Sequence, residues 1–274
     1  MPDWLVWPGL VLLGVGVGAY GTMIGAGGGF VLVPTLLLLY PNDPPELITS
    51  ISLAVVFFNA LSGTGAYIYQ RRIDLLAANA FAAATIPGAV AGALVVGLLP
   101  RDAFDVVFAL LLVLVSAFLV LRPTARIRQR GQGSGVVSRM LTDRSGDTYS
   151  YSYNLVAGVA MSVVVGFVSS LLGVGGGIIH VPLMVQVLLF PAHIATATSH
   201  YVLMISALVG TLVHLASGDL EGGYRETGAL ALGVLVGAQI GARLSKLVHG
   251  TSLMRLLAGA MILVALRLLL TPLL

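Results

Sequence analysis

The chain has 274 residues, of which 58% are hydrophobic and only 9% are charged, and its formal net charge is +3. Soluble domains carry about 25% charged residues, so this composition excludes an ordinary soluble domain and indicates a membrane protein. The sequence contains no cysteine, which excludes disulfides, thiol catalysis and thiolate metal sites. The small positive charge therefore bears on membrane topology, and no nucleic-acid partner is expected.

The first apolar segment lies at the N-terminus and is split by glycine. Its two parts, 5–24 and 29–40, flank the glycines of GAGGGFVLVP at 25–34. Three uninterrupted apolar segments follow, at 49–70, 75–99 and 103–121. A helix needs about 20 apolar residues to cross a bilayer, so each of the three is predicted to be a transmembrane helix.

A polar segment follows these helices. Residues 123–152 are rich in Gly and Ser, and together with Arg122 they hold six arginines against Asp143 and Asp147. Basic loops remain in the cytoplasm, so we expect a cytoplasmic linker here. It would separate a first membrane repeat at 1–122 from a second at 153–274.

The second half repeats the pattern of the first. LGVGGGIIHVP at 172–182 matches IGAGGGFVLVP at 24–34, and two further blocks match in the same order at nearly the same offset. Recurrence at a fixed offset is the sign of an internal repeat. It predicts a split segment at 154–172 and 177–190, followed by spans at 196–216, 227–248 and 253–270.

Charge predicts how the two halves are oriented. Arg71 and Arg72 follow the first long span, whereas in the second half the loop 217–226 is acidic and the basic cluster comes later, at Arg243, Lys246 and Arg255. If basic loops face the cytoplasm, equivalent spans cross in opposite directions. We therefore predict an all-α polytopic membrane protein of two inverted repeats. Each repeat would hold a glycine-broken helix pair or re-entrant hairpin plus three transmembrane helices. The alternative is a parallel repeat in which each split segment crosses once.

The two glycine breaks are the predicted substrate site. A helix that starts after a break exposes unpaired N–H groups and about +0.5 of an elementary charge, which favours an anion. Broken segments at matching positions of two halves are typical of transporter sites. Close helix packing is the alternative role for the glycines. The residues predicted to contact a small oxyanion are Gly27, Gly28, Gly29, Phe30, Gly175, Gly176, Gly177 and Ile178.

Polar residues recur at equivalent positions of the two halves, within TSISLAVVFFNALSGT and TATSHYVLMISALVGT. Their amide and hydroxyl donors are predicted to complete the shell around the anion, with hydrogen bonding between helices as the alternative. They are Asn59, Ser52, Thr49, Thr196, Ser199 and Ser206.

Histidines are the candidates for proton coupling. No Asp or Glu lies well inside a predicted span, and imidazole titrates near neutral pH. His200 and His180 are the two candidates, and for each the alternative is a neutral, hydrogen-bonded core residue. No metal site or cofactor is expected.

The duplicated GxGGGxxxVP motif, the four-segment halves and the size resemble the TauE/SafE family of sulfite-exporter-like permeases over nearly the whole chain. The resemblance implies a secondary transporter of the bacterial inner membrane, not an enzyme. It would move sulfite or an organosulfonate by alternating access, with proton coupling left open. An anion channel on the same scaffold is the alternative. The expected partners are the small anion and the lipid bilayer, and a homodimer is left open.

Overall fold

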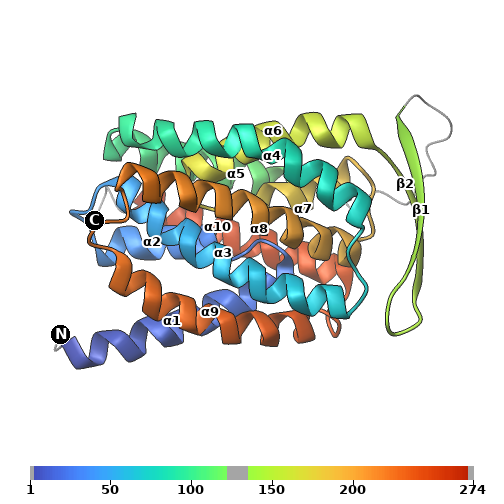
Figure 1. Cartoon of the computed structure of the whole chain (residues 1–274), viewed down its shortest axis with the longest axis horizontal. Coiled ribbons are helices and arrows are strands. Elements are labelled where there is room, and N and C mark those ends of the chain that lie inside the picture. Colours follow the sequence, from blue (N-terminus) through green and yellow to red (C-terminus); the bar gives the residue numbers. More distant parts are fainter. Residues whose placement is uncertain (1–2, 122–134, 271–274) are drawn as a thin grey trace.

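The computed structural model describes residues 3–121 and 135–270 as a helical bundle with a small β-hairpin at one end (Figure 1). The all-α, polytopic prediction is confirmed, with the hairpin as its one exception among the described residues. Five helical segments are long and apolar enough to cross a membrane: Val6–Ile24, Pro45–Tyr69, Leu75–Leu98, Ala192–Ser217 and Tyr224–Leu244.

The first half begins with two helices separated by a glycine break, α1 (Asp3–Ile24) and α2 (Gly29–Leu39). Three uninterrupted helices follow as predicted, α3 (Pro45–Tyr69), α4 (Leu75–Val95, extended by the 3-10 turn η1 at Val96–Leu98) and α5 (Arg101–Leu121). Local sequence sets their starts. Pro45 supplies a fixed φ at the first position of α3. The Asp74 carboxylate accepts the N–H groups of the first turn of α4.

The second half has the same order of elements. α6 (Leu155–Leu171) and α7 (Gly177–Gln186) flank the second break, and α8 (Ala192–Ser217), α9 (Tyr224–Leu244) and α10 (Gly250–Leu270) follow. The Asn154 side chain caps α6 by accepting the Ala157 N–H at 2.9 Å. Both predicted helix breaks are therefore present, within a residue or two of the predicted bounds.

Helix contacts come in matched pairs. α1 packs along α9, and its counterpart α6 packs along α4; likewise α3 contacts α9, and α8 contacts α4. α3 also packs on α8, and α5 on α10. Glycines allow the closest approaches: Gly14 and Gly18 of α1 touch the α9 backbone, and Gly88 and Gly92 of α4 touch the α6 backbone. These glycines serve helix packing, as small residues do in membrane bundles.

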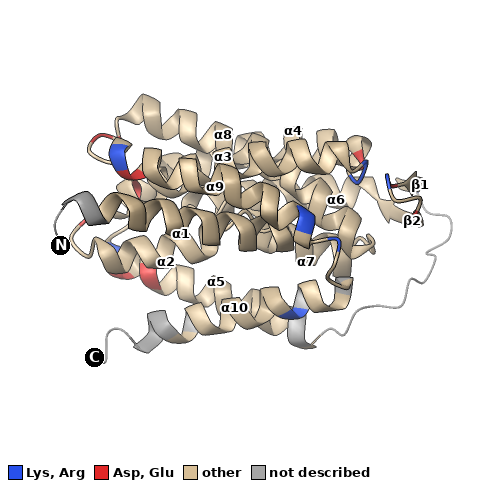
Figure 2. Cartoon of the chain, turned by 90° about the horizontal axis from the view of Figure 1, so that it is seen from below, with Lys and Arg blue, Asp and Glu red and all other residues tan. Residues whose placement is uncertain are grey.

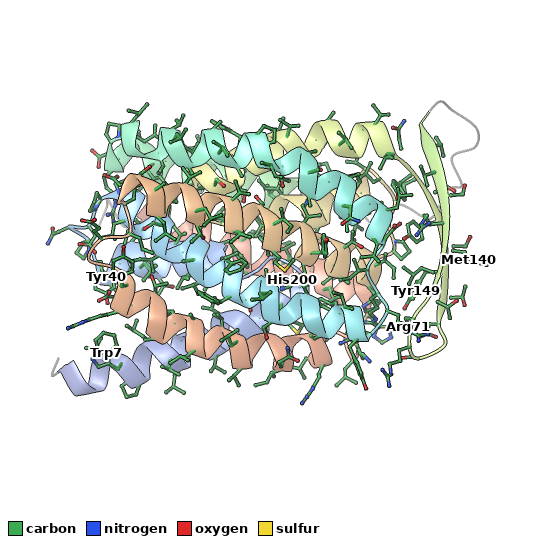
Figure 3. All side chains as sticks on the ribbon, in the orientation of Figure 1. Trp7, Tyr40, Arg71, Met140, Tyr149 and His200 are labelled. Atoms are coloured by element: carbon green, nitrogen blue, oxygen red, sulfur yellow. The ribbon has the colours of Figure 1, made fainter. Side chains whose placement is uncertain are left out.

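Each split segment enters the bundle and turns back. Trp7 in α1 and Tyr40, just after α2, lie at the same end of the molecule (Figure 3). In the second half, α6 starts directly after the β-hairpin, and Phe190, which follows α7, returns to it, with its ring 4.9 Å from that of Tyr151. The two re-entrant hairpins come in from opposite ends of the bundle (Figure 1).

Part of the predicted linker is folded. β1 (Val136–Thr142) and β2 (Thr148–Asn154) pair in antiparallel register, a hairpin that the sequence analysis did not predict. Buried polar contacts dock it on the bundle: Arg72 Nε lies 3.3 Å from Asp143 Oδ2, and the Tyr151 hydroxyl donates to Asp74 Oδ2 at 2.8 Å. The linker residues Arg122, Arg126, Arg128 and Arg130 lie outside the described part of the chain.

Charged side chains gather at the two ends of the bundle (Figure 2). By the ends of their helices and strands, the end that carries the hairpin, here called the basic end, holds Arg71, Arg72, Arg139, Arg144, Arg243 and Lys246 against Asp74, Asp143 and Asp147. The opposite end, here called the acidic end, holds Asp43, Glu46, Asp102, Asp105, Asp219, Glu221 and Glu226 against Arg101 and Arg225. The long faces between the ends are almost free of charge, as a bilayer requires.

Candidate functional site

The two glycine breaks touch each other at the centre of the bundle. A Cβ atom added at Gly29 would lie 2.8 Å from the Gly173 carbonyl oxygen, and one added at Gly177 would lie 2.5 Å from that of Gly25. Both separations are shorter than real Cβ contacts allow. The first residue of α2 therefore packs on the second break, and the first residue of α7 packs on the first break.

Backbone conformation explains the other glycines of the motif. The break residues adopt positive φ values that L-residues with a side chain rarely reach. In the first break φ is 75° at Gly27 and 85° at Gly28; in the second it is 76° at Gly175 and 80° at Gly176. The glycine-rich motif is thus required by local geometry as well as by close contact.

The breaks lie halfway along the bundle. Gly27 and Gly175 both pack against the same two side chains, Val56 and Leu203, which are close to the middle of α3 and α8. Val56 and Leu203 belong to a small buried apolar cluster. This cluster fills the space beside the breaks, so the site is closed to solvent in this conformation.

Several backbone donors at the breaks have no acceptor. Within the described residues no hydrogen bond is made by the N–H groups of Gly28, Gly29, Phe30, Gly176, Gly177 and Ile178. All six residues are buried. Each N-terminus carries about +0.5 of an elementary charge, and here two of them adjoin. The predicted binding residues of the two motifs are therefore brought together in space.

Polar side chains around the first break form a connected network. The Asn59 amide donates from Nδ2 to the Gly27 carbonyl oxygen at 2.9 Å and accepts from Thr22 Oγ1 at 3.0 Å. The Tyr67 hydroxyl donates to the Thr22 carbonyl oxygen at 2.7 Å. His200 Nε2 lies 3.2 Å from Thr22 Oγ1. Since the Thr22 hydroxyl hydrogen goes to Asn59, an N–H on Nε2 would complete this contact.

Polar side chains around the second break make fewer hydrogen bonds. Ser52 donates to the Gly173 carbonyl oxygen at 2.7 Å, but several neighbouring hydroxyls are buried and have no hydrogen-bond partner within the described residues. They are Ser169, Ser170 and Ser206. Ser199 is also buried and unpaired, but it lies one turn from Thr196, which packs on the first break. Buried polar groups are nearly always paired in folded proteins, so these hydroxyls are available to water or to a ligand.

Ser169 and Ser170 escaped the sequence analysis. A signal was present, because Ser170 occupies the position equivalent to Thr22 at the 148-residue offset of the glycine motif. The Ser170 hydroxyl also approaches Gly210, where an added Cβ would be 2.9 Å away. Gly210 lies one turn beyond Ser206 on α8. Ser170 and Ser206 therefore sit on neighbouring helix surfaces beside the second break.

The other predicted residues have different surroundings. Thr49 and Thr196 donate within their own helices, to Glu46 O at 3.1 Å and to Ala192 O at 2.8 Å, and their backbone packs on Gly173 and Gly25. These two threonines position the breaks and keep no free donor.

The two histidines also differ. The His200 ring is packed edge-on to the Tyr67 ring and lies beside the first break, near the centre of the bundle (Figure 3). His180 faces α6 and α4 instead: its Nε2 is 3.0 Å from Ser162 Oγ, and its ring is 5.8 Å from that of Phe81. Of the two, only His200 joins the network at the breaks.

Comparison with known proteins agrees with this architecture. The family described as "Sulfite exporter TauE/SafE" matches residues 10–268. The chain belongs to the TauE/SafE family. The match includes both glycine breaks and all the side chains described around them, so the TauE/SafE resemblance is confirmed, and with it the assignment as a membrane transporter.

Two curated relatives support the assignment. The chain is 34% identical over 263 residues, covering 93% of it and 94% of the relative, to the "Probable membrane transporter protein YunE" of Bacillus subtilis. It is 23% identical over 218 residues, 78% of this chain and 74% of the relative, to the "Probable membrane transporter protein MJ0441" of Methanocaldococcus jannaschii. No solved structure matches the chain.

Proposed function

We propose that this TauE/SafE protein is a secondary transporter, and not an enzyme, that moves a small sulfur-containing oxyanion, sulfite or an organosulfonate, across the plasma membrane. The observation that carries the proposal is the contact between the two breaks, where Gly29 and Gly177 start facing helices at the centre of the bundle. Two helix N-termini with unpaired N–H groups suit a small anion far better than a cation or a neutral solute.

The substrate would be ligated mainly by hydrogen bonds. Around the breaks lie unpaired backbone N–H groups and the free hydroxyls of Ser170 and Ser206, with no charged side chain among them. Hydrogen bonds from neutral donors hold an anion without the stronger attraction of an Arg or Lys. We therefore expect moderate affinity and ready release, which a transporter requires.

Alternating access would come from the arrangement of the halves as an inverted repeat. One re-entrant hairpin comes from each end of the bundle, and the matched helix pairs support a two-fold relation between the halves. In inverted-repeat transporters the substrate stays near the midplane while one part moves relative to the other. With the basic end in the cytoplasm, the β-hairpin would be cytoplasmic.

His200 is the proposed proton carrier. Its Nε2 contacts Thr22 Oγ1 beside the first break, and its ring also interacts with the Gly25 backbone. A proton on Nδ1 would place a positive charge next to the anion site. Proton and anion would then bind cooperatively and cross together.

The experiment that tests the function is uptake of labelled sulfite into proteoliposomes, with and without a pH gradient. Saturable uptake that unlabelled sulfite or sulfoacetate suppresses would support the transporter. Flux that rises linearly with concentration and carries no stoichiometric proton movement would support the channel alternative. If no sulfur anion moves, the proposed substrate class is wrong.

A matched pair of variants ties the flux to the breaks. Gly28→Leu places a side chain where φ is 85° and where a Cβ would lie 2.5 Å from Val17 Cγ1, so uptake should be lost. Gly259→Leu adds the same side chain in α10 where nothing lies within 4 Å of the added Cβ. Wild-type uptake by Gly28→Leu would contradict a role for the break.

A further inference from the structure

A cavity lined by polar and basic side chains lies at the basic end, away from the glycine breaks. It has a volume of about 300 Å³ and lies between the end of α3 and the end of α9. Its lining residues are Gly65, Ala66, Tyr69, Gln70, Gln239, Arg243 and Lys246. We call this cavity the vestibule.

The vestibule is electropositive. Arg243 and Lys246 line it, are exposed, and form no ion pair within the described residues. A third cation stands at its rim, because the Arg144 guanidinium at the hairpin turn stacks 3.9 Å from the centre of the Tyr69 ring. The nearby carboxylate of Asp143 is already engaged by Arg72. Unpaired cations around a concave site attract and concentrate anions.

The vestibule also contains an orphaned hydrogen-bond acceptor. Gln70 is only 5% exposed, and its Nε2 donates to the Ala242 carbonyl oxygen at 3.1 Å. That bond fixes the amide orientation, and the other amide atom, Oε1, has no partner within the described part of the chain. A buried acceptor without a donor is costly. The ligand that suits the vestibule is thus an oxyanion that also carries a hydrogen-bond donor.

A chain of contacts leads from the vestibule to the network at the first break. Gln239, at the cavity wall, donates from Nε2 to both the carbonyl oxygen and the hydroxyl of Ser62, at 2.8 and 2.9 Å. The next residue, Gly63, is the one against which the His200 ring packs. The Gln239–Ser62 contact is therefore a partition between the vestibule and the network at the first break.

From these observations we propose that the vestibule is a second anion-binding site, which holds the transported oxyanion at the basic end before or after it occupies the breaks. The ligand is a small oxyanion bearing a hydrogen-bond donor, such as hydrogensulfite or an aminosulfonate. Arg243 and Lys246 bind its charge, Gln70 accepts from its donor, and Gln239 parts from Ser62 to let it pass. This inference rests on the proposed transport function.

The test measures the KM for sulfite separately at the two faces, in inside-out and right-side-out membrane vesicles. The double variant Arg243→Gln, Lys246→Gln should raise the KM at the basic face about tenfold at low ionic strength, since two nearby charges are removed. The increase should shrink as salt rises to about 0.5 M, where charges are screened within a few ångströms. The KM at the acidic face should not change.

Two matched variants separate the site from general effects. Arg225→Gln removes an exposed cation at the acidic end and should leave the KM at the basic face unchanged. Gly65→Leu fills the vestibule where an added Cβ meets nothing within 4 Å. It should also raise the KM at the basic face, but without the salt dependence, because both charges remain. Gly259→Leu in α10 is the control for Gly65→Leu. Equal KM values for Arg225→Gln and the double variant would overturn the proposal.

A direct measurement of sulfite binding tests the vestibule even if no sulfite transport is detected. Sulfite is titrated into the purified, full-length protein by calorimetry, in nanodiscs of phosphatidylcholine with and without phosphatidylglycerol. Weaker binding by the double variant in both lipids supports the vestibule even if wild-type vesicles move no sulfur anion, an outcome that would sink only the proposed function. If phosphatidylglycerol abolishes the difference between wild type and double variant, the cavity holds a lipid headgroup and the proposal is wrong.

Discussion

Asn59 and Ser206 occupy equivalent positions on α3 and α8 but differ in their hydrogen bonding. Asn59 donates to the carbonyl oxygen of Gly27 in the first break, whereas the Ser206 hydroxyl beside the second break has no partner within the described residues. Asn59 therefore stabilises the fold, whereas the Ser206 hydroxyl is available to a ligand. This difference gives the two breaks separate roles and makes them separable by mutation.

Asn59→Ala should destabilise the protein. The substitution leaves the Gly27 carbonyl oxygen and the Thr22 hydroxyl without their 2.9 and 3.0 Å partners. We expect a loss of about 1–2 kcal/mol in the free energy of unfolding, measured by thermal or denaturant unfolding in detergent. Asn79→Ala is the control, because Asn79 only accepts one exposed hydrogen bond from Tyr201. Equal losses for the two variants would contradict a structural role for Asn59.

Ser170→Ala and Ser206→Ala should impair substrate binding and leave stability unchanged. Neither hydroxyl has a partner to lose, so the melting temperature should stay within about 1–2 °C of wild type. The KM for the transported anion should rise about tenfold or more, since one hydrogen bond to a charged ligand is worth about 1.5 kcal/mol or more. Ser52→Ala is the contrasting variant: it removes the bond to Gly173 and should lower stability. Unchanged kinetics in both free-hydroxyl variants would show that the anion does not reach them.

Gly29→Ala and Gly177→Ala should push the two breaks apart. The added methyl groups would meet backbone atoms of the other half at 2.8 and 2.5 Å, and backbone cannot yield as a flexible side chain can. We expect a destabilisation of about 1–3 kcal/mol, as for other overpacked sites, together with loss of transport. Gly16→Ala, in α1 where nothing lies within 4 Å of the added Cβ, should be neutral in both measurements.

The sequence predicted the breaks well because the cause is local. Positive φ at Gly28 and Gly176 favours glycine at these positions. The duplication repeats the same glycines in both halves. The hydrogen-bond partners of the polar side chains around the breaks could not be predicted. Ser52 and Ser199 look alike in the sequence, yet only Ser52 finds a carbonyl oxygen. Such differences depend on contacts between residues more than a hundred positions apart.

The β-hairpin was missed for another reason. TYSYSY at 148–153 alternates polar and aromatic residues with the period of a strand, but the arginines and glycines before it favoured the interpretation of a linker. The aromatic side is buried because Tyr151 and Tyr153 pack on Phe190, and Tyr151 reaches Asp74. The polar composition of the segment reflects its exposed residues and gave no indication that Tyr151 and Tyr153 form a buried face.

Docking of the hairpin should weaken in the alkaline range. Burial and the neighbouring Asp74 carboxylate raise the pKa of the Tyr151 hydroxyl above its ordinary value. A raised pKa means that this stabilisation is complete below about pH 10 and is lost as the pH rises further. Because the chain has no cysteine, a fluorophore on Ser145→Cys can report hairpin mobility by anisotropy. The anisotropy should be constant from about pH 6 to 9 and fall above about pH 10, and Tyr151→Phe should weaken the fall. A transition near neutral pH would contradict this account.

His200→Gln should remove the dependence of transport on the pH gradient. Glutamine keeps an N–H that can donate to Thr22 Oγ1, as His200 Nε2 does at 3.2 Å, but it has no group that titrates near neutral pH. Sulfite uptake should then proceed at the same rate with and without a gradient, while the melting temperature stays close to that of the wild type. His180→Gln is the matched variant, because His180 is equally buried but bonds to Ser162 on α6 and not to the break network. It should retain the response to the gradient. If both variants respond like the wild type, the proton crosses elsewhere, and if both lose the response, position at the break is not what selects the proton carrier.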